Sequence, residues 1–225
     1  LFGDKANPPL QNTVSQYIHP DYPQIYRVSN QTDDKGIPTG RKGAGTYWHS
    51  DVSFRKCPAQ ASILSCKQLP EVGGDTIFAD QTRAYEALSV GMQKLLSNLY
   101  AWHDFEIAAR TQYTKRTVVQ NDLDGGNRAL HPVVRTHAET KQKSLYVNPG
   151  FTSHIDQFFA EESRVILEFI YEHSIKPEFV YRHIWKDKDL VIWDNRTMMH
   201  YAVMDYSDDQ PRYMERCTVI SEIPI

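Results

Sequence analysis

Two side chains that bind metal ions well stand two positions apart in the stretch GTYWHSDVSF, residues 45–54: His49 and Asp51. We predict a strand here, and because successive side chains of a strand point to opposite faces, His49 and Asp51 would share one face. A third ligand is available in His200, within VIWDNRTMMHYAV. Two neutral imidazoles and one carboxylate form the ligand set of non-haem Fe(II) oxygenases, which leaves positions open for small molecules.

Two arginines that follow His200 strengthen this interpretation. Arg212 and Arg216 lie four residues apart in a predicted strand, so their side chains share a face. A 2-oxo diacid that chelates iron through its 2-oxo-carboxylate end has a second carboxylate, and a guanidinium binds such a group through two hydrogen bonds. The simpler interpretation of the two arginines is that they lie on a solvated strand face. An isolated H-x-D match, such as His49 and Asp51, is likewise often structural.

Other classes of metal protein remain open on these residues alone. A structural zinc site is usually closed by four protein ligands, often cysteines, and no fourth ligand is evident at this spacing. A zinc hydrolase needs a general base beside a metal-bound water, and the motif offers no carboxylate for that role besides Asp51. A metal-binding jelly-roll protein without turnover is the non-catalytic alternative, although such a scaffold has no need for paired arginines.

The composition argues against several classes of partner. The chain has 225 residues, 40% of them hydrophobic, which is enough for one substantial core. Its formal net charge is −3 and no basic block occurs, so we predict no nucleic-acid partner. No apolar run reaches the length of a membrane span, so we predict no membrane partner. Cys57, Cys66 and Cys217 are odd in number and widely spaced, which favours reduced thiols and a cytoplasmic location.

The elements that must position these side chains are predicted to be mostly strands. A long loop, residues 20–46, leads into the opening motif. Strands are predicted at 61–70, 129–137, 143–149, 189–195 and 212–220, and residues 73–80 are predicted to form a turn followed by a short strand. Helices are predicted at 81–100, with a break near residue 90, and at 161–175. Strands at both ends with helices between them indicate an antiparallel sheet or barrel flanked by helices. In helix 161–175 we expect Val165, Ile166, Phe169 and Ile170 to form the apolar face.

Several further motifs occur in a set order along the chain. They are WHSDVSF (48–54), VGGDTIFAD (72–80), AYEALS (84–89), LHPVVRTH (130–137), GFTSHI (150–155), KPEF (176–179), WDNRTMMHYAVMDY (193–206) and RYMERCTV (212–219). Because these motifs occur together and in this order, the chain resembles the Fe(II)/2-oxoglutarate-dependent dioxygenases of the taurine dioxygenase (TauD/TfdA) family. The resemblance covers nearly all of residues 1–225, as a single domain. It implies a fold that is mainly β with inserted helices and has a double-stranded β-helix (jelly-roll) core.

The resemblance also implies an oxidoreductase with Fe(II), 2-oxoglutarate and O2. His49, Asp51 and His200 would be the iron ligands and catalytic residues, and Thr76 and Arg212 would bind the distal carboxylate of 2-oxoglutarate. The implied substrate-binding residues are His19 and Tyr22 of HPDY (19–22), Val52 through its backbone N–H, Phe151 and Arg216. The implied reaction hydroxylates a small anionic organic substrate and releases succinate and CO2. Because the family usually has some tens of residues before a segment like LFGDKANPPL, we expect an N-terminal portion to be missing.

Two departures from taurine dioxygenase bear on the substrate. Gly45 stands where that enzyme has an Asn, and a pocket Phe aligns near Ala109. The anion-binding residues His19 and Arg216 are kept. We therefore expect a sulfonate such as taurine, which would give an aldehyde and sulfite, and keep a carboxylate (amino acid, sugar acid or aryloxy acid) as the alternative. The residues leave the exact substrate and the oligomeric state open, a homo-oligomer included.

The remaining histidines are predicted to be structural. For His131 and His137 the alternative is a hydrogen bond to a metal ligand. His103 and His173 are expected at the surface or partly buried. Residues 193–195 are expected to shape the loop before His200 and not to react.

Overall fold

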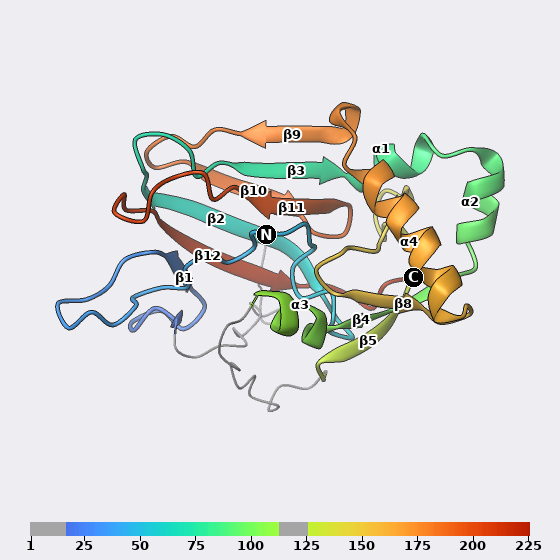
Figure 1. Ribbon diagram of the computed structural model, residues 1–225, viewed down its shortest axis with the longest axis horizontal. Coiled ribbons are helices and arrows are strands. Elements are labelled where there is room, and N and C mark those ends of the chain that lie inside the picture. The colour runs from blue at the N-terminus through green and yellow to red at the C-terminus, as the bar shows by residue number, and fades with distance from the viewer. Residues whose placement is uncertain (1–16, 113–125) are drawn as a thin grey trace.

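The computed structural model describes residues 17–112 and 126–225, and strands with inserted helices make up most of it (Figure 1). The strands are β1 (Tyr26–Ser29), β2 (Ala59–Gln68), β3 (Thr76–Asp80), β4 (Tyr100–Asp104), β5 (Arg128–Pro132), β6 (Val134–Thr136), β7 (Lys143–Leu145), β8 (Thr152–Ile155), β9 (Val180–His183), β10 (Leu190–Asp194), β11 (Met198–Ala202) and β12 (Tyr213–Ile220). The helices are α1 (Gln81–Glu86), α2 (Val90–Leu96), α3 (Phe105–Gln112), α4 (Ala160–Ser174) and the 3-10 helix η2 (Pro177–Phe179). The predicted fold class, mainly β with inserted helices, is confirmed.

The described strands pair in four antiparallel sheets. The largest has the order β1-β12-β2-β10, and a second has the order β11-β3-β9. Two smaller sheets have the orders β5-β4-β8 and β6-β7. Figure 1 shows α1, α2 and α4 gathered at one end of the two larger sheets. Because β2 pairs with both β10 and β12, a strand from the first third of the chain lies directly beside the C-terminal strands.

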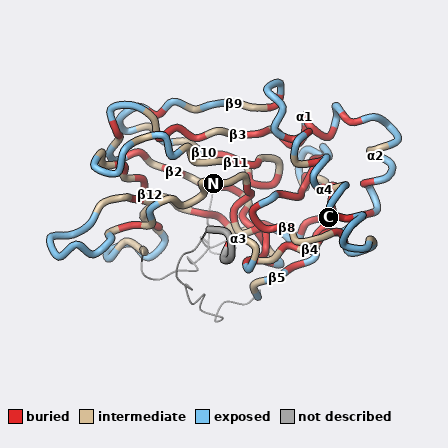
Figure 2. Tube along the Cα trace, in the orientation of Figure 1, coloured by how far each residue is buried: buried red, intermediate tan, exposed pale blue. Residues whose placement is uncertain are grey.

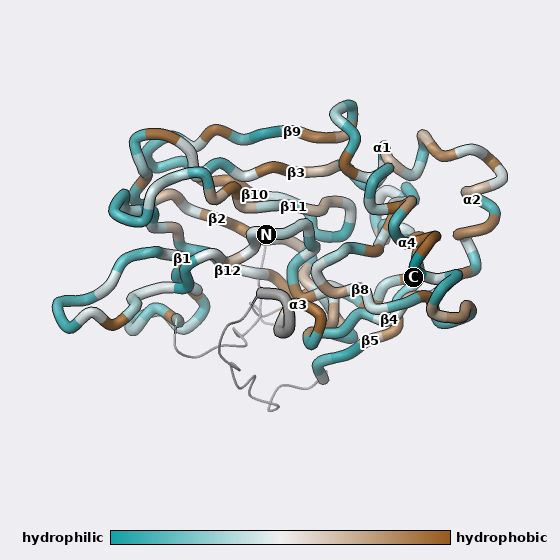
Figure 3. The backbone as a smooth tube through the Cα atoms, viewed as in Figure 1, coloured by the Kyte–Doolittle hydropathy of each residue, from teal (hydrophilic) through white to brown (hydrophobic). Residues whose placement is uncertain are grey.

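One hydrophobic core joins the two larger sheets. Leu64 of β2, Trp193 of β10 and Met214 of β12 pack in one cluster with Phe78 of β3. Each such side chain contributes roughly 1.5–3 kcal/mol when it is fully buried. Figure 2 marks buried residues along β2 and β3, and Figure 3 shows hydrophobic and hydrophilic residues alternating along the strands. In β2 this alternation buries Leu64 and Cys66 in the core and leaves Ile63 and Ser65 more exposed.

A second core joins α1 and α4 to the smaller sheets. Leu167 and Ile170 of α4 are buried there with Ile155 of β8. The predicted apolar face of the helix was wrong for two of its four residues, because Val165 is 59% exposed and Phe169 is 45% exposed. The helix approaches β8 through a small residue instead: Ser163 is buried, and its Oγ accepts a hydrogen bond from the backbone N–H of Ile155 at 2.7 Å.

The predicted strand over residues 45–54 was wrong. His49 forms only an isolated antiparallel bridge with His200, and the chain then turns at residues 51–54. The turn begins with Val52 in the left-handed region, at φ 48°, which a β-branched residue rarely adopts. The two side chains that the strand was expected to align are therefore brought together by one bridge and a tight turn.

Two histidines that were predicted at the surface or partly buried, His103 and His173, lie in the interior, as does His131, which was predicted to be structural. His103 of β4 is completely buried, and its Nδ1 is 3.0 Å from Ser53 Oγ. His131 of β5 is also buried and donates from Nε2 to the carbonyl of Arg55 at 2.9 Å. His173 of α4 is buried too. His103 and His131 thus support the turn that follows Asp51, without a hydrogen bond to any of the metal-type side chains.

The three cysteines carry free thiols, so no disulfide joins them. No helix within the described ranges is long and apolar enough to cross a lipid bilayer. The cytoplasmic location stays a prediction.

Candidate metal centre

The bridge between His49 and His200 forms the first part of the centre. Each residue donates its backbone N–H to the carbonyl of the other, at 3.1 and 2.8 Å, and the ring centroids are 4.1 Å apart. Asp51 follows in the turn, with Oδ1 3.6 Å from His49 Nε2 and Oδ2 3.9 Å from His200 Nε2. All three side chains are buried, and their ligand atoms lie within 4.8 Å of one another. No other group of three such residues occurs in the described part of the chain.

The surroundings of both imidazoles suit metal binding. His49 Nδ1 lies 2.8 Å from the carbonyl of Tyr47, and because a carbonyl only accepts, Nδ1 carries a proton and Nε2 is the nitrogen that can bind a metal. Burial, followed by the nearby His49, holds the pKa of His200 well below its usual value, so this ring is neutral. Neutral imidazole nitrogen is the ligand state that Fe(II) needs.

The Asp51 carboxylate is ionised in spite of its burial. Burial alone would raise its pKa, but the guanidinium of Arg216 outweighs that effect and holds the pKa well below its usual value. Arg216 Nη1 donates to Oδ1 at 2.7 Å. Ser62 Oγ donates to Oδ2 at 2.6 Å, since an ionised carboxylate can only accept.

Asn195 completes this network. Its Nδ2 donates to Ser62 Oγ at 2.8 Å, and its Oδ1 accepts from Trp193 Nε1 at 3.0 Å and from the backbone N–H of Asp51 at 3.3 Å. The amide therefore fixes which way the Ser62 hydroxyl points. The sequence reasoning missed Ser62, although a serine that falls on the inner face of a mostly apolar strand was a usable signal.

An open cavity lies beside this centre. His49 and His200 line it together with Thr76, Arg212 and Arg216. Two imidazoles and a carboxylate that converge on one side of an open, cationic cavity fit Fe(II), because the metal would keep positions free for further ligands. A closed four-ligand zinc site does not fit this arrangement.

Arg212 and Thr76 form the cavity wall predicted to bind 2-oxoglutarate. Arg212 lies immediately before β12, not inside it as predicted, and is 4% exposed. Burial lowers the pKa of its guanidinium, yet arginine keeps its charge in proteins. Its Nε donates to the carbonyl of Gly74 at 3.0 Å. A buried cation of this kind, with its other N–H groups beside a cavity, is suited to binding an anion.

The residues predicted to bind the prime substrate are only partly brought together. Arg216 lines the cavity, and the ring of Phe151 is buried 6.0 Å from that of His49. Val52 sits in the turn directly after Asp51. His19 and Tyr22 are not among the residues that line the cavity in the described part of the chain: Tyr22 is 57% exposed, and its ring centroid lies 5.0 Å from that of His19. Their substrate-binding role stays a prediction.

Of the two positions at which the sequence departs from taurine dioxygenase, the structure places Gly45 at the cavity and leaves the side chain of Ala109 undescribed. Gly45 lines the cavity at φ 75°, and a Cβ on it would come within 2.8 Å of His49 Cε1. Any larger residue here would therefore displace a metal-type side chain or change the backbone. Ala109 falls in α3, but its side chain lies outside the described residues.

Comparison with known proteins decides the family. The sequence model described as "Taurine catabolism dioxygenase TauD, TfdA family" matches residues 1–218. The chain belongs to this family. Membership in TauD/TfdA confirms the resemblance on which the site residues were predicted.

Relatives of this TauD/TfdA chain differ in what their names say they act on. It is 32% identical over 226 residues to an alpha-ketoglutarate-dependent sulfonate dioxygenase of Saccharomyces cerevisiae, covering 97% of the chain and 50% of the relative. It is 35% identical over 209 residues to an alpha-ketoglutarate-dependent 2,4-dichlorophenoxyacetate dioxygenase of Burkholderia sp., covering 88% and 68%.

The crystal structure of a taurine dioxygenase from Burkholderia xenovorans matches with a TM-score of 0.78 and 30% identity, covering 96% of this chain and 69% of that one. The chain spans about half the length of the relatives it matches from Schizosaccharomyces pombe and S. cerevisiae, 45% and 50% respectively.

Proposed function

We propose that this protein is an Fe(II)- and 2-oxoglutarate-dependent dioxygenase that hydroxylates a small anionic substrate and releases succinate and CO2. The observation that carries the proposal is the opening of His49 and His200, with Asp51 beside them, onto a cavity that also holds Arg212 and Arg216. A metal site alone would fit a scaffold. A metal site beside two arginines, in a chain of the TauD/TfdA family, fits a centre that gathers anions around iron.

His49, Asp51 and His200 would hold the iron, which when bound supplies the redox chemistry that couples O2 to the co-substrate and to a C–H bond. The other residues bind and orient. Arg212 and Thr76 hold the distal carboxylate of 2-oxoglutarate on the buried side of the cavity. Binding the tail of the co-substrate against this buried, positively charged wall fixes the direction of the tail and excludes water from the tail.

The proposed prime substrate is a sulfonate such as taurine, which would leave as an aldehyde and sulfite. Arg216 donates through Nη1 to Asp51, so its Nη2 is the group we assign to the substrate anion. The name of the S. cerevisiae relative supports a sulfonate. An aryloxy acid or another carboxylate is the second candidate, favoured by the name of the Burkholderia relative and by the absence of a side chain at Gly45.

We further propose that the two larger sheets belong to a double-stranded β-helix (jelly-roll) core and that the chain forms one domain. The pairing of β2 with β10 and β12, and of β3 with β9 and β11, supports this arrangement because each sheet combines strands from distant parts of the sequence.

Succinate formation tests the function directly. The protein is incubated with Fe(II), 2-oxoglutarate and O2, with taurine, an alkylsulfonate, an aryloxyacetate and an amino acid in parallel. We expect one anionic class to stimulate succinate release, with sulfite appearing in equal amount if the substrate is a sulfonate. The Asp51→Ala variant serves as the blank. Substrate-coupled succinate release by that variant would contradict the proposal.

A further inference from the structure

Trp185 makes a hydrogen bond to the cavity wall that sequence reasoning did not predict. Its indole Nε1 donates to Thr76 Oγ1 at 3.0 Å, and both side chains are buried. Trp185 lies in the segment between β9 and β10 and packs in the same core cluster as Phe78 and Trp193. Thr76 opens β3 and lines the cavity beside Arg212.

The chemistry of the two groups sets the direction of the threonine hydroxyl. An indole N–H can only donate, so Thr76 Oγ1 must use a lone pair to accept from it. The hydroxyl proton is then available to donate away from Trp185. An ionised carboxylate can only accept, and a hydrogen bond from a hydroxyl to such a group is among the stronger kinds.

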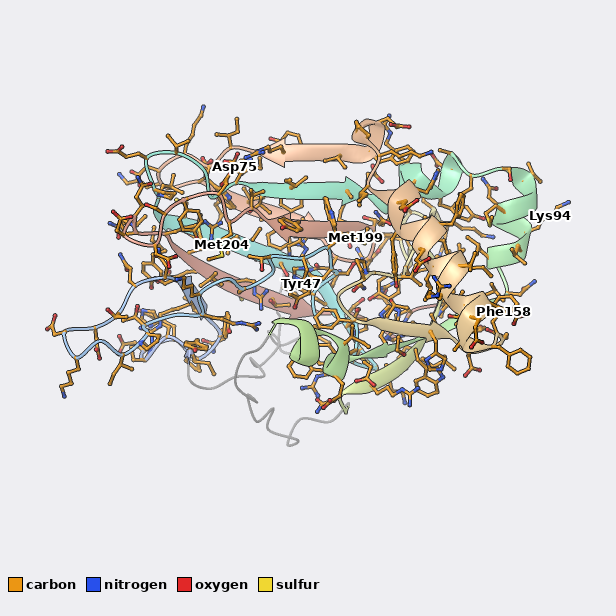
Figure 4. The ribbon with its side chains drawn as sticks, viewed as in Figure 1. Tyr47, Asp75, Lys94, Phe158, Met199 and Met204 are labelled. Atoms are coloured by element: carbon orange, nitrogen blue, oxygen red, sulfur yellow. The ribbon has the colours of Figure 1, made fainter. Side chains whose placement is uncertain are left out.

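The guanidinium of Arg212, beside Thr76, is also oriented by a hydrogen bond to the protein. Arg212 Nε is engaged by the carbonyl of Gly74, and the backbone N–H of Gly74 donates to Asp205 Oδ1 at 2.8 Å. Arg182 in turn contacts both Asp205 and Asp75, and Figure 4 shows Asp75 at the end of the sheet where β3 begins. Asp205 and Arg182 thus hold the loop before β3 in place. This loop orients Arg212 through its Nε, and the terminal N–H groups of Arg212 remain for an anion.

We propose that Trp185 is a positioning residue that fixes the Thr76 hydroxyl as a donor to the distal carboxylate of 2-oxoglutarate. This inference rests on the proposed function, because it assigns that carboxylate to the wall formed by Thr76 and Arg212. Trp185 itself does not touch the co-substrate. Its effect on affinity passes through Thr76 and depends on a carboxylate at the tail of the ligand.

Calorimetric binding of 2-oxoglutarate to the full chain loaded with Mn(II), which does not turn over, tests the inference. Trp185→Phe removes the N–H and keeps an aromatic ring, and we expect binding about 3- to 10-fold weaker. Thr76→Val removes the hydroxyl at similar volume, and we expect binding about 10-fold weaker. In the double variant we expect no loss beyond that of Thr76→Val, because the indole acts only through the hydroxyl.

A matched ligand separates positioning from general damage. 2-Oxopentanoate has a methyl group in place of the distal carboxylate, so its affinity should be the same in the wild type and in Trp185→Phe. Equal weakening of both ligands would show a merely structural role and overturn the inference. Unchanged binding of 2-oxoglutarate by Trp185→Phe would also overturn it. If the wild type binds no 2-oxoglutarate at all, the proposed function itself fails.

A measurement on the wild type covers the case in which Trp185→Phe does not fold. The indole N–H signal of Trp185 is followed by ¹⁵N NMR in protein loaded with diamagnetic Zn(II), and it is assigned by its displacement in Thr76→Val. We expect 2-oxoglutarate to move this signal, because the acceptor of the indole gains a new partner, and 2-oxopentanoate to leave it in place. The same response to both ligands, or to neither, would contradict the inference.

Discussion

Asp51 is the single residue on which the proposed metal centre depends most, since it supplies the only charge among the three ligands. Asp51→Asn keeps the shape of the side chain and removes that charge. We expect Mn(II) affinity to fall by more than about 100-fold, beyond the 10- to 100-fold typical when only a partner of a ligand is lost. Calorimetric titration measures this, with Glu71→Gln, an exposed acid, as the control. Equal affinity in Asp51→Asn and the wild type would contradict the assignment.

Ser62 acts on the metal through Asp51. Its hydroxyl donates to Oδ2 at 2.6 Å and is oriented by Asn195, so Ser62→Ala frees the carboxylate to rotate. We expect Mn(II) affinity to fall about 10-fold, the usual loss for a group that orients a ligand. Ser65→Ala, on the same strand and the opposite face, is the matched control and should bind as the wild type does. A similar loss in both variants would mean that β2 itself was disturbed.

At this scale the sequence predicts ligands better than the residues that orient them. His49, Asp51 and His200 are identifiable because only a few side-chain types bind Fe(II), and Thr76 and Arg212 follow from the motifs around them. Ser62 and Trp185 have no such signature. Their importance comes from one hydrogen bond each across the sheet, and neither the strand pairing nor the side-chain direction that makes it is visible in a single sequence.

Among the elements, the strand pair β4 and β5 makes stability sensitive to acid. Burial lowers the pKa of His131 to about 4, whereas an unfolded chain keeps about 6.5. The unfolded state therefore binds more protons between these values, and the free energy of unfolding falls as pH drops from about 6.5 towards 4. His131 alone accounts for about 3 kcal/mol at the acid end. Burial also holds the pKa of His103 well below its usual value, which adds to the same trend.

The variant His131→Gln tests the source of this slope. Glutamine keeps an N–H for the carbonyl of Arg55 but takes no proton. The free energy of unfolding of the variant should therefore change less steeply with pH between 6.5 and 4.5. Denaturant unfolding at a series of pH values measures the slope. Asn98→Gln, which changes an exposed side chain that takes no proton, should keep the wild-type slope. If the two variants behave alike, His131 is not the group responsible.

The elements also show where the sequence pattern stops predicting structure. The strands β2, β10 and β12 and the helix α4 are predictable because their hydrophobic periodicity is sustained. The predicted strand over residues 45–54 fails because a single bridge and a turn at Val52 replace it. The same order of amino-acid types suits a strand or a bridge followed by a turn, so the sequence does not separate the two. The strands β4 and β8 pair with each other, and β4 also pairs with β5; such pairing is tertiary information.

In the whole molecule, metal binding and folding should be coupled, because His49 and Asp51 lie in one half of the chain and His200 in the other. Metal that binds only the folded state raises the free energy of unfolding by about 2.7 kcal/mol at a concentration 100 times its dissociation constant. For a chain of this size that corresponds to a rise in Tm of about 5–10 °C. We expect Mn(II) to produce this rise, EDTA to reverse it, and Asp51→Asn to show neither change. A Tm that is independent of metal in the wild type would mean that the two halves do not close on one ion.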